Sequence, residues 1–598
     1  MCGFTGSISF REIDNKEVEL ANKVIECRGP DSTNFTQKKH KNKFVSLCFN
    51  RLAILDLAEI ANQPMYSADF KTTLLFNGEI YNHQELRTDL KNKGLKFQTS
   101  HSDSETLLIG ISYYGLDFIK KIRGQFAIVF LDEKNDKLYL IRDRLGQKPL
   151  YFTYNDQRIN FGSSLLSLLP LEKNYSLDIN QIYNYLNYGK IISPYTLFKN
   201  LYKVEPAQVL AFDLKKDKFE MKKFKYWDIK DSLSEDEFDN EYFFDIFSES
   251  INIRASADVP VSNLLSGGID STSIIKNMVD SQKEVNSFSI YLTNSKYDES
   301  NYIKEVVNKY QTNHRAVSIS SDITKQQILE ALDCLDEPYS DPSVVPSYII
   351  SKEISKYFKV AISGDGGDEL LGGYKRTMLS LNKGSFVGDV FSKLITFYPS
   401  FLGSGNKFLL NSTDLEKKYR SFLEDHKLLK LLGVESSEYN YADCLSYLNN
   451  NYFKNLLISD YKFFLPEMMM FKIDRTSMAN SLEVRSPFVD HKLIEYIMST
   501  KNSYIDTNNS KMILKNYLRQ DFEKDFLQRK KQGFVFDVEK WVYSNINFIK
   551  EVISNGEIIK NLNQNAISLL QLNKSRINGQ RIWRLFVLEN YISKIFSR

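Results

Sequence analysis

The chain has 598 residues, of which 42% are hydrophobic and 26% are charged, values that are ordinary for a folded globular protein. At about 100–200 residues per domain, this length indicates several domains rather than one. The formal net charge of +3 is close to balance, which argues against a global attraction to nucleic acid or to an anionic membrane.

Cysteine usage and hydropathy predict a cytoplasmic location. The five cysteines are Cys2, Cys27, Cys48, Cys334 and Cys444. They are widely spaced and form no CxxC pair, which argues against a disulfide framework or a zinc site. No basic-then-apolar segment opens the chain, and no apolar run reaches about 18 residues. We therefore expect a soluble, cytoplasmic protein with neither nucleic acid nor a membrane among its partners.

The first 210 residues contain short apolar runs of the length that strands have. The runs cover residues 74–76, 126–131 and 138–141. The polar stretch 133–136, between the last two runs, predicts a hairpin turn. Helices are expected over residues 84–93 and 103–114. These elements predict an α+β domain over residues 1–210.

The pattern changes after this domain. Residues 211–240 are charged and lack clear periodicity, which predicts a linker. Strands and helices then alternate, which is typical of a parallel, doubly wound sheet. The expected elements are a helix over 241–255, a strand over 260–265, a helix from Ser271, and strands over 286–291, 315–319 and 359–362. We expect a mainly helical and irregular chain after about 377, within a second domain over 241–598.

The chain opens with Met1-Cys2-Gly3. A small second residue usually allows removal of the initiator methionine, and Cys2 would then carry a thiol and a free α-amine. The amine, with a pKa of about 8, can act as the base that activates the thiol of the same residue. A cysteine at this position is usually incidental, so the interpretation depends on the segments that follow.

Five segments accompany this cysteine in order along the chain. They are MCGFTG at 1–6, RGPD at 28–31, NRLAI at 50–54, NGEIYN at 77–82 and SDSE at 102–105. Together they resemble the glutaminase domain of the N-terminal-nucleophile amidotransferases, over nearly all of residues 1–210. The resemblance implies an αββα sandwich that binds glutamine and attacks its side-chain amide with Cys2.

Each polar residue in these segments suits one group of glutamine. Arg51 can form a bidentate contact with the α-carboxylate. Glu79 and Asp103 can meet the α-ammonium. The Asn77 side chain and the Gly78 backbone N–H can donate to the oxyanion that develops during attack.

Simpler interpretations exist for some of these residues. Asn77-Gly78 is also the sequence of a type I′ hairpin turn, and Arg51 alone would be a surface salt bridge. Their occurrence in order with Cys2 favours the functional interpretation. The resemblance adds Leu52 and Ile54 to the glutamine-binding set. Many family members have His before Arg-Gly-Pro-Asp, and here Cys27, expected to be a small buried apolar residue, takes its place.

A glycine-rich loop follows a predicted strand and opens a helix. Its sequence, LLSGGIDSTS at 264–273, provides backbone N–H groups and the hydroxyls of Ser266, Ser271 and Thr272 for phosphate oxygens. It lacks the Gly-Lys-Ser/Thr of a Walker A loop. It resembles the pyrophosphate loop of ATP pyrophosphatases, which transfer AMP and release pyrophosphate, and the alternative is a glycine turn into a capped helix. Asp270 is expected to coordinate Mg²⁺ that bridges the phosphates.

A second acidic loop, SGDGGDE at 363–369, follows another predicted strand end. Ligands of open α/β sheets bind at the carboxyl ends of the strands, so Asp368 is the expected second Mg²⁺ ligand. The alternatives are a calcium-like acidic loop and a solvated turn.

The two parts together resemble the class B, glutamine-hydrolysing asparagine synthetases. Further matching segments are 372–374, 474–478, 483–488 and 529–534. The resemblance covers essentially the whole chain and weakens between about 377 and 455. The ATP-binding residues that it implies are Leu265, Ser266, Gly267, Gly268, Asp270, Ser271, Ile290, Ser363 and Gly364.

Two further residues receive roles from this resemblance. Lys511 matches a lysine that stabilises charge near the acyl adenylate, a role that suits a mobile point charge; the alternative is an exposed lysine at a helix start. Asp365 matches an acidic position tied to the acyl-adenylate step, where we expect Glu in some asparagine synthetases. Because Asp is one methylene shorter, the acceptor geometry can differ.

The expected reaction follows. Cys2 releases ammonia from glutamine, ATP with Mg²⁺ adenylates aspartate, and ammonia travelling by a buried route forms asparagine. The open alternative is amidation of another carboxylate, such as a sugar acid in surface polysaccharide synthesis. A catalytically silent protein is disfavoured by the presence of Cys2 and Asp270. A tRNA-modifying ATP pyrophosphatase is disfavoured by the near-neutral charge and isolated cysteines. A homodimer is plausible from the resemblance.

Overall fold

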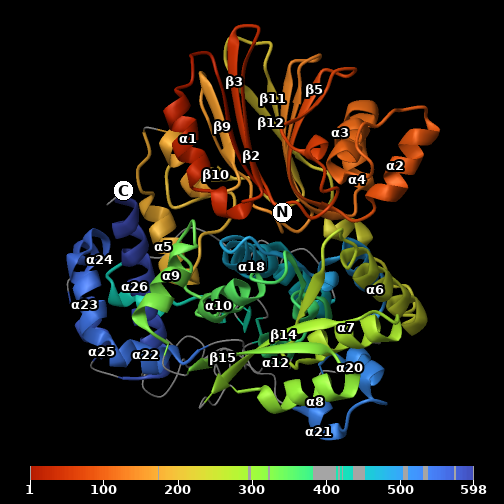
Figure 1. Cartoon of the computed structure of the whole chain (residues 1–598). Coiled ribbons are helices and arrows are strands. Elements are labelled where there is room, and N and C mark those ends of the chain that lie inside the picture. The colour runs from red at the N-terminus through yellow and green to blue at the C-terminus, as the bar shows by residue number, and fades with distance from the viewer. Residues whose placement is uncertain are drawn as a thin grey trace.

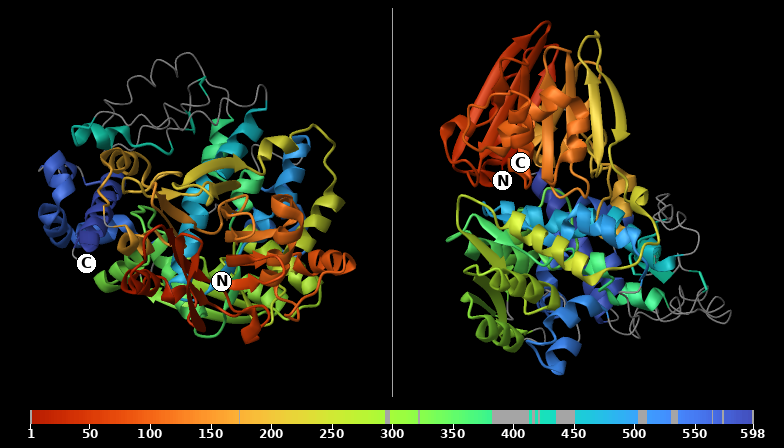
Figure 2. Two further views of the ribbon diagram at one scale, coloured as in Figure 1. Left: turned by 90° about the horizontal axis from the view of Figure 1, so that it is seen from above. Right: turned by 90° about the vertical axis from the view of Figure 1, so that its right-hand side faces the viewer.

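The computed structural model describes residues 2–172, 174–293, 298–320, 323–381, 413–414, 418–419, 422–434, 451–502, 510–529, 536–563, 565–571 and 574–596. Cys444 and all of the predicted 529–534 segment except Arg529 lie outside these residues. Two structural halves stack on each other (Figure 1), and the right-hand view of Figure 2 shows the same arrangement from the side.

The first half contains two stacked antiparallel sheets. Their strand orders are β10-β8-β9-β1-β3-β2 and β12-β11-β7-β6-β5-β4. The strands are β1 (Gly3–Ser9), β2 (Ser32–His40), β3 (Lys43–Arg51), β4 (Met65–Ser67), β5 (Thr72–Ile80), β6 (Gly124–Asp132), β7 (Lys137–Arg142), β8 (Tyr151–Tyr154), β9 (Arg158–Gly162), β10 (Tyr202–Lys203), β11 (Gln208–Asp213) and β12 (Glu220–Lys225). The predicted 133–136 hairpin is confirmed, because Asp132 pairs with Lys137.

Helices cover the outer faces of this sandwich. They are α1 (Asn15–Lys23), α2 (His83–Asn92), α3 (Asp103–Tyr114) and α4 (Phe118–Lys121), whereas α5 (Ile179–Tyr188) lies below the sandwich and packs against helices of the second half (Figure 1). Helix α1 packs on β1 and β3, and α3 packs on β4 and β5. Apolar side chains such as Phe4, Leu75 and Val129 fill the space between the sheets. The predicted αββα architecture is confirmed, and it explains why β5 is buried on both faces.

The segment predicted to be a linker contains regular structure. Strand β12 pairs with β11 from Gln208↔Lys225 to Asp213↔Glu220. Its side chains are mostly exposed and include Lys222, Lys223 and Lys225, a composition that discourages pairing of a sheet edge with another chain. The sandwich therefore extends past residue 210, while the proposed domain boundaries stay predictions.

The second half contains a parallel sheet of strand order β15-β14-β13-β16-β17. Its elements are α6 (Asn240–Arg254), β13 (Val261–Leu264), α7 (Ile269–Asp280), β14 (Asn286–Thr293), α8 (Ser300–Tyr310), β15 (Asn313–Ser320), α9 (Lys325–Asp333), α10 (Val344–Ile354), β16 (Val360–Ile362), α11 (Gly367–Leu371), α12 (Lys375–Ser380) and β17 (Glu483–Arg485). The predicted parallel sheet is confirmed. The short strand β17 was not predicted, and it lies beside β16 with Ile362 opposite Arg485.

The rest of the described chain is helical, as expected. The helices are α16 (His426–Leu431), α17 (Tyr452–Ser459), a π-helix (Asp460–Met470), α18 (Phe471–Met478), α19 (His491–Ser499), α20 (Met512–Leu518), α21 (Lys524–Gln528), α22 (Val538–Ser544), α23 (Ile546–Asn555), α24 (Glu557–Leu562), α25 (Ala566–Gln571) and α26 (Arg576–Phe596). Helix α18 lies directly below the amino terminus (Figure 1). Among the described residues, no helix combines the length and the apolar character that crossing a bilayer requires.

Candidate active sites

Cys2 lies buried immediately before β1, within the first half. Its backbone N–H donates to Asn77 Oδ1 over 3.2 Å. Burial is the largest influence and raises the pKa of the Cys2 thiol, whereas the charge of the amino terminus and the backbone N–H of Leu52 lower it. A thiol in this environment stays protonated at neutral pH, so its activation needs a nearby base.

Asn77 and Gly78 lie inside β5, opposite Ala127 and Phe126. The type I′ turn interpretation is therefore wrong, because the chain continues as a strand through both residues. Asn77 Nδ2 is buried and meets no acceptor among the described residues. A buried donor without an acceptor is costly, so this amide is available for an oxyanion. A Cβ on Gly78 would lie 2.0 Å from Gln125 O in β6. Glycine at this position therefore permits the close approach of β5 and β6.

Arg51 is buried at the end of β3 rather than exposed. Its Nη1 donates to Ala58 O over 2.9 Å and to Asn62 Oδ1 over 2.7 Å, and its Nη2 donates to Asp56 O over 2.5 Å. The surface salt-bridge interpretation is therefore wrong. The guanidinium holds the loop that follows Ile54, and both of its terminal nitrogens contact this loop.

Two carboxylates lie in the same part of the sandwich. Asp103 Oδ2 accepts a hydrogen bond from the Ile80 backbone N–H over 3.1 Å. Glu79 Oε2 lies 3.2 Å from Arg485 Nη2, which belongs to the second half. Burial raises the pKa of both carboxyls, and it outweighs the opposing charge of Arg485 at Glu79. The structure thus brings Glu79 and Asp103 together.

The neighbouring predicted residues have mixed outcomes. The side chains of Leu52 and Ile54 are buried, as expected for a substrate pocket wall. Cys27 is exposed, so the expectation of a buried apolar residue is wrong. Cys27 lies in a short 3-10 turn, Glu26–Arg28, from which only the Arg28 side chain turns inward.

Arg28 connects the first half to the second. Its Nε donates to Cys2 O over 3.2 Å, while Nη1 and Nη2 donate to the two carboxylate oxygens of Asp474 over 2.8 and 3.0 Å. Burial alone would raise the pKa of Asp474, but Arg28, Lys148 and Arg475 together lower it to about 2. The backbone of the proposed nucleophile is thereby held by helix α18 of the other half.

This ion pair should make stability depend on pH. The Asp474 pKa lies below its unfolded value of about 3.9, so its stabilisation is present above about pH 4 and is lost as pH falls toward about 2. We expect Asp474→Asn to cost about 3–5 kcal/mol at pH 7, since it leaves a buried Arg28 without its charged partner. Denaturant unfolding of both proteins from pH 7 to pH 3 should show the difference shrinking with acid. A constant difference would contradict the assigned pKa.

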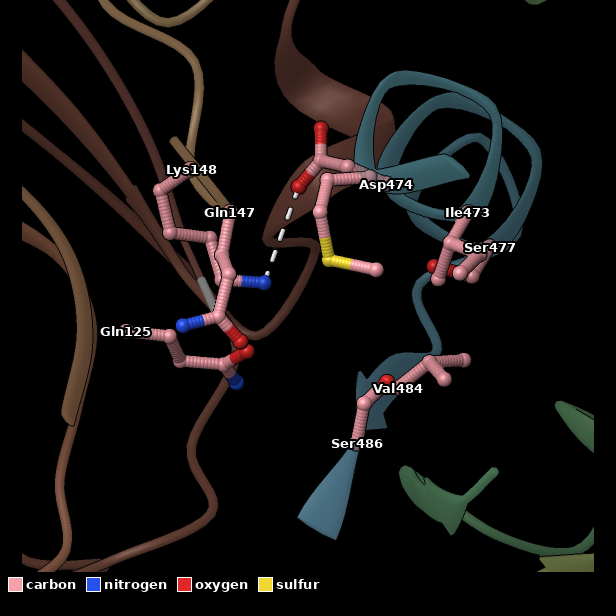
Figure 3. Close-up of a pocket in the computed structure, with 9 residues that line it drawn as sticks. Gln125, Gln147, Lys148, Ile473, Asp474, Ser477, Val484 and Ser486 are labelled. Carbon is pink, nitrogen blue, oxygen red and sulfur yellow. Dashed lines mark ion pairs between the residues drawn. The ribbon is translucent and has the colours of Figure 1, made fainter. Parts of the chain in front are cut away.

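A pocket lies between the halves beside this ion pair (Figure 3). Its lining residues are Gln125, Gln147, Lys148, Met470, Ile473, Asp474, Ser477, Val484 and Ser486. Lys148 and Asp474 point toward one another, with Nζ 3.7 Å from Oδ1. On the opposite side, Ser486 Oγ lies 3.0 Å from Ser363 Oγ, where the second acidic loop begins. The pocket therefore borders contacts to both predicted sites.

The predicted phosphate loop connects β13 to α7. Gly267 has a φ of +68°, a conformation that favours glycine. The Gly268 backbone N–H donates to Ser266 Oγ over 3.2 Å, and Ser266 Oγ lies 3.1 Å from Ser271 Oγ. This strand–loop–helix arrangement directs the first N–H groups of α7 toward the loop, as an anion site requires.

The second acidic loop lies against the first. A Cβ on Gly364 would lie 3.0 Å from Ser271 N, and one on Gly367 would lie 2.7 Å from Asp270 Oδ1. Glycines at these positions therefore permit the close approach of the two loops. Among the other predicted nucleotide residues, Leu265 and Ser363 are buried directly after β13 and β16, and Ile290 is buried within β14. Asp365 is partly exposed between β16 and α11.

Lys511 joins the two predicted metal ligands. Its Nζ forms ion pairs with both Asp270 and Asp368, and a Cβ on Gly373 would overlap its Cε at 2.2 Å. The side chain is only 8% exposed, so the exposed-lysine interpretation is wrong. Because one ammonium contacts both carboxylates, these lie close enough to share a cation. Paired carboxylates at a phosphate loop fit Mg²⁺.

Several buried charged residues at the junction received no role from sequence reasoning. Arg485 Nε donates to Glu483 Oε1 over 2.6 Å, and Gln125 Nε2 lies 3.5 Å from the same oxygen. The Ser363 backbone N–H donates to Arg485 O over 2.9 Å. Strand β17 therefore contacts the glutamine-side residue Glu79 and the nucleotide-side residue Ser363. The 483–488 segment, which matches the family, was the sequence signal that could have identified these residues. The residues that they contact in space are distant in sequence.

Each half of the chain matches a known protein family. Residues 1–227 match the glutamine amidotransferase domain model, and residues 243–587 match the asparagine synthase model. Glutamine-hydrolyzing asparagine synthetase 1 of Bacillus subtilis is 28% identical, covering 98% of this chain and 96% of that protein. Asparagine synthetase 3 of the same bacterium is 28% identical, with coverages of 89% and 87%. Amidase chry2 of Gibberella zeae is 24% identical, with coverages of 83% and 80%. The chain belongs to the asparagine synthase family.

Proposed function

We propose that this chain is a glutamine-dependent asparagine synthetase. It hydrolyses glutamine at Cys2, adenylates aspartate with ATP and transfers the ammonia to form asparagine, AMP and pyrophosphate. The observation that carries the proposal is the joint between the halves, where Arg28 links Cys2 O to Asp474 and where Arg485 links Glu79 to the strand beside Ser363. Such a joint fits an enzyme whose two sites exchange an intermediate.

In the glutaminase step, removal of Met1 frees the α-amine of Cys2. The amine takes the thiol proton, and the sulfur attacks the side-chain amide carbon of glutamine. Asn77 Nδ2, which has no acceptor among the described residues, and Gly78 N–H donate to the oxyanion. The C–N bond breaks, ammonia leaves with the transferred proton, and water hydrolyses the thioester to glutamate.

In the synthetase step, a carboxylate oxygen of the acceptor bonds to the α-phosphorus of ATP, and pyrophosphate leaves. Ammonia then attacks the activated carbonyl, and AMP leaves. Asp270 and Asp368 would hold Mg²⁺, which supplies charge neutralisation on the phosphate oxygens. Ser266, Ser271 and the first N–H groups of α7 orient the phosphates.

The pocket between the halves is the proposed passage for ammonia. It is bordered by Asp474, which is connected through Arg28 to Cys2, and by Ser486, which contacts Ser363. Free ammonia would be protonated in water and would then lose its nucleophilicity. A passage enclosed by both halves keeps it from bulk solvent.

Filling this pocket should uncouple the two reactions. Val484 lines the pocket and is buried, so in Val484→Phe we expect product formed per glutamate released to fall about tenfold, because a close-packed interior leaves no other space for the ring. Product formation with added ammonium chloride should persist. Val542→Phe adds the same volume at a buried position in α22, outside the pocket lining, and should keep the wild-type ratio. An unchanged ratio in Val484→Phe would exclude this passage.

The identity of the acceptor is the finer part of the proposal. Mass spectrometry of products from glutamine, ATP, Mg²⁺ and aspartate tests it, with sugar acids as competing acceptors. Asparagine and AMP are expected with aspartate. Asp365, where Glu is expected in some family members, is the observation that favours testing another carboxylate. If aspartate with supplied ammonia elicits no AMP while another acid does, the aspartate assignment fails and the amidotransferase assignment survives.

A further inference from the structure

A buried arginine beside the phosphate loop has hydrogen-bonding capacity that its described surroundings leave unused. Arg529 follows α21, and its side chain is 8% exposed. Nη2 lies 3.3 Å from Glu299 Oε1, whereas Nη1 is buried and meets no acceptor among the residues that the structure describes. Burial of a charged donor without an acceptor is costly, so this nitrogen indicates a ligand.

The guanidinium is held in one orientation. Its Cζ lies 4.3 Å from the Tyr302 ring centroid and 5.4 Å from the Phe526 ring centroid, distances at which a cation is attracted to an aromatic face. Glu299 and Tyr302 belong to the start of α8, and a Cβ on Gly267 would lie 3.1 Å from Ile303 N of the same helix. Helix α8 therefore positions Arg529 and the phosphate loop together.

The held guanidinium lies next to the amino terminus of α7. A Cβ on Gly268, the residue preceding this twelve-residue helix, would lie 3.7 Å from Arg529 Nη2. No side chain can intervene at this glycine. The helix dipole and first N–H groups favour an anion at the same place, and the hydroxyls of Ser266 and Ser271 lie in the same loop.

We propose that Arg529 is a catalytic residue that binds the β- and γ-phosphates of ATP and the pyrophosphate released from it. The inference rests on the proposed function. A planar guanidinium matches phosphate oxygens better than an ammonium does. As the acceptor oxygen bonds to the α-phosphorus, the bond from that phosphorus to the α–β bridging oxygen breaks, and the electron pair leaves on pyrophosphate. Arg529 Nη1 donates to the oxygens that gain this charge.

Calorimetric titration of the full-length protein with inorganic pyrophosphate and Mg²⁺ tests the inference. We expect Arg529→Met to weaken pyrophosphate binding by about ten- to a hundredfold. Arg529→Lys should recover part of the lost pyrophosphate affinity. In Arg529→Met, the KM for ATP should rise together with the dissociation constant for pyrophosphate. Arg519→Met is the control, since Arg519 is exposed at the end of α20. This variant should bind pyrophosphate with the wild-type affinity.

The possible outcomes separate the two proposals. If the wild type binds no pyrophosphate, the proposed adenylating function fails and this inference fails with it. If the wild type binds pyrophosphate and Arg529→Met binds it equally well, Arg529 has only a structural role. If Arg529→Met does not fold, Arg529→Lys decides the question, because it retains the charge and loses the planar donor pair. Undiminished affinity in that variant overturns the inference.

Discussion

Replacing Cys2 by alanine should abolish glutamate release from glutamine, with a loss of about a thousandfold or more, as removal of a nucleophile costs in other hydrolases. Cys2 is the buried residue whose backbone N–H donates to Asn77 and whose carbonyl accepts from Arg28. Asparagine formation from glutamine should disappear with it. Formation from ammonium chloride should remain, because the nucleotide loops lie in the other half. A coupled glutamate assay and product mass spectrometry measure both effects.

Cys48→Ala is the matched control for this substitution. Cys48 is also a buried free cysteine, in β3 opposite Thr5, and its loss should leave glutamate release near the wild-type rate. Intact-protein mass spectrometry must also show that the purified chain begins at Cys2. An active enzyme that retains Met1 would remove the α-amine from the mechanism.

Asp270→Asn should eliminate the nucleotide-dependent reaction. We expect the rate of pyrophosphate release to fall about a thousandfold, since loss of a metal-ligating carboxylate removes several kcal/mol of charge stabilisation from the transition state. Lys511 would keep its ion pair with Asp368 in this variant. Glutamate release should continue, because Asp270 lies in α7 of the second half, whereas Cys2, Asn77 and Gly78 lie in the first. Pyrophosphate release with ATP and aspartate measures the effect.

Asp280→Asn provides the comparison on the same helix. Asp280 is exposed at the carboxyl end of α7 and pairs with Lys276 and Tyr517. It loses the same charge outside the phosphate loop and should retain pyrophosphate release. Equal losses in the two variants would show that Asp270 acts through the stability of α7 and not through a bound cation.

Much of the fold follows from local patterns. The helix 103–114 and the strands on either side of residues 133–136 were predicted because their periodicity and turn residues are contained within a few positions. Strand β17 was missed because Glu483-Val484-Arg485 carries charges at both ends of a three-residue strand. Both charged side chains are buried, and Glu79 and strand β16, which lie beside them, come from distant parts of the sequence.

The sites show the same division between local and distant information. The phosphate loop was predictable, since its glycines, hydroxyls and flanking elements are contiguous. The sequence Asn77-Gly78 fits both a type I′ turn and an oxyanion-binding pair. The position of both residues inside the buried strand β5 distinguishes these alternatives. The packing of separate helices brings Lys511 into contact with Asp270 and Asp368. It also places Arg529 beside Gly268. The spacing of these residues along the sequence does not reveal how far apart they lie in space.

The buried joint has a consequence for modularity. Asp474 and Arg485 lie wholly inside the molecule, where Arg28 and Glu79 pair with them from the other half. Separately expressed halves would each expose an apolar face with unmatched charges, at a cost of several kcal/mol per stranded charge. Shuffling amidotransferase units between relatives would therefore require exchanging the partners as matched pairs, so the two halves would be inherited and engineered as one body.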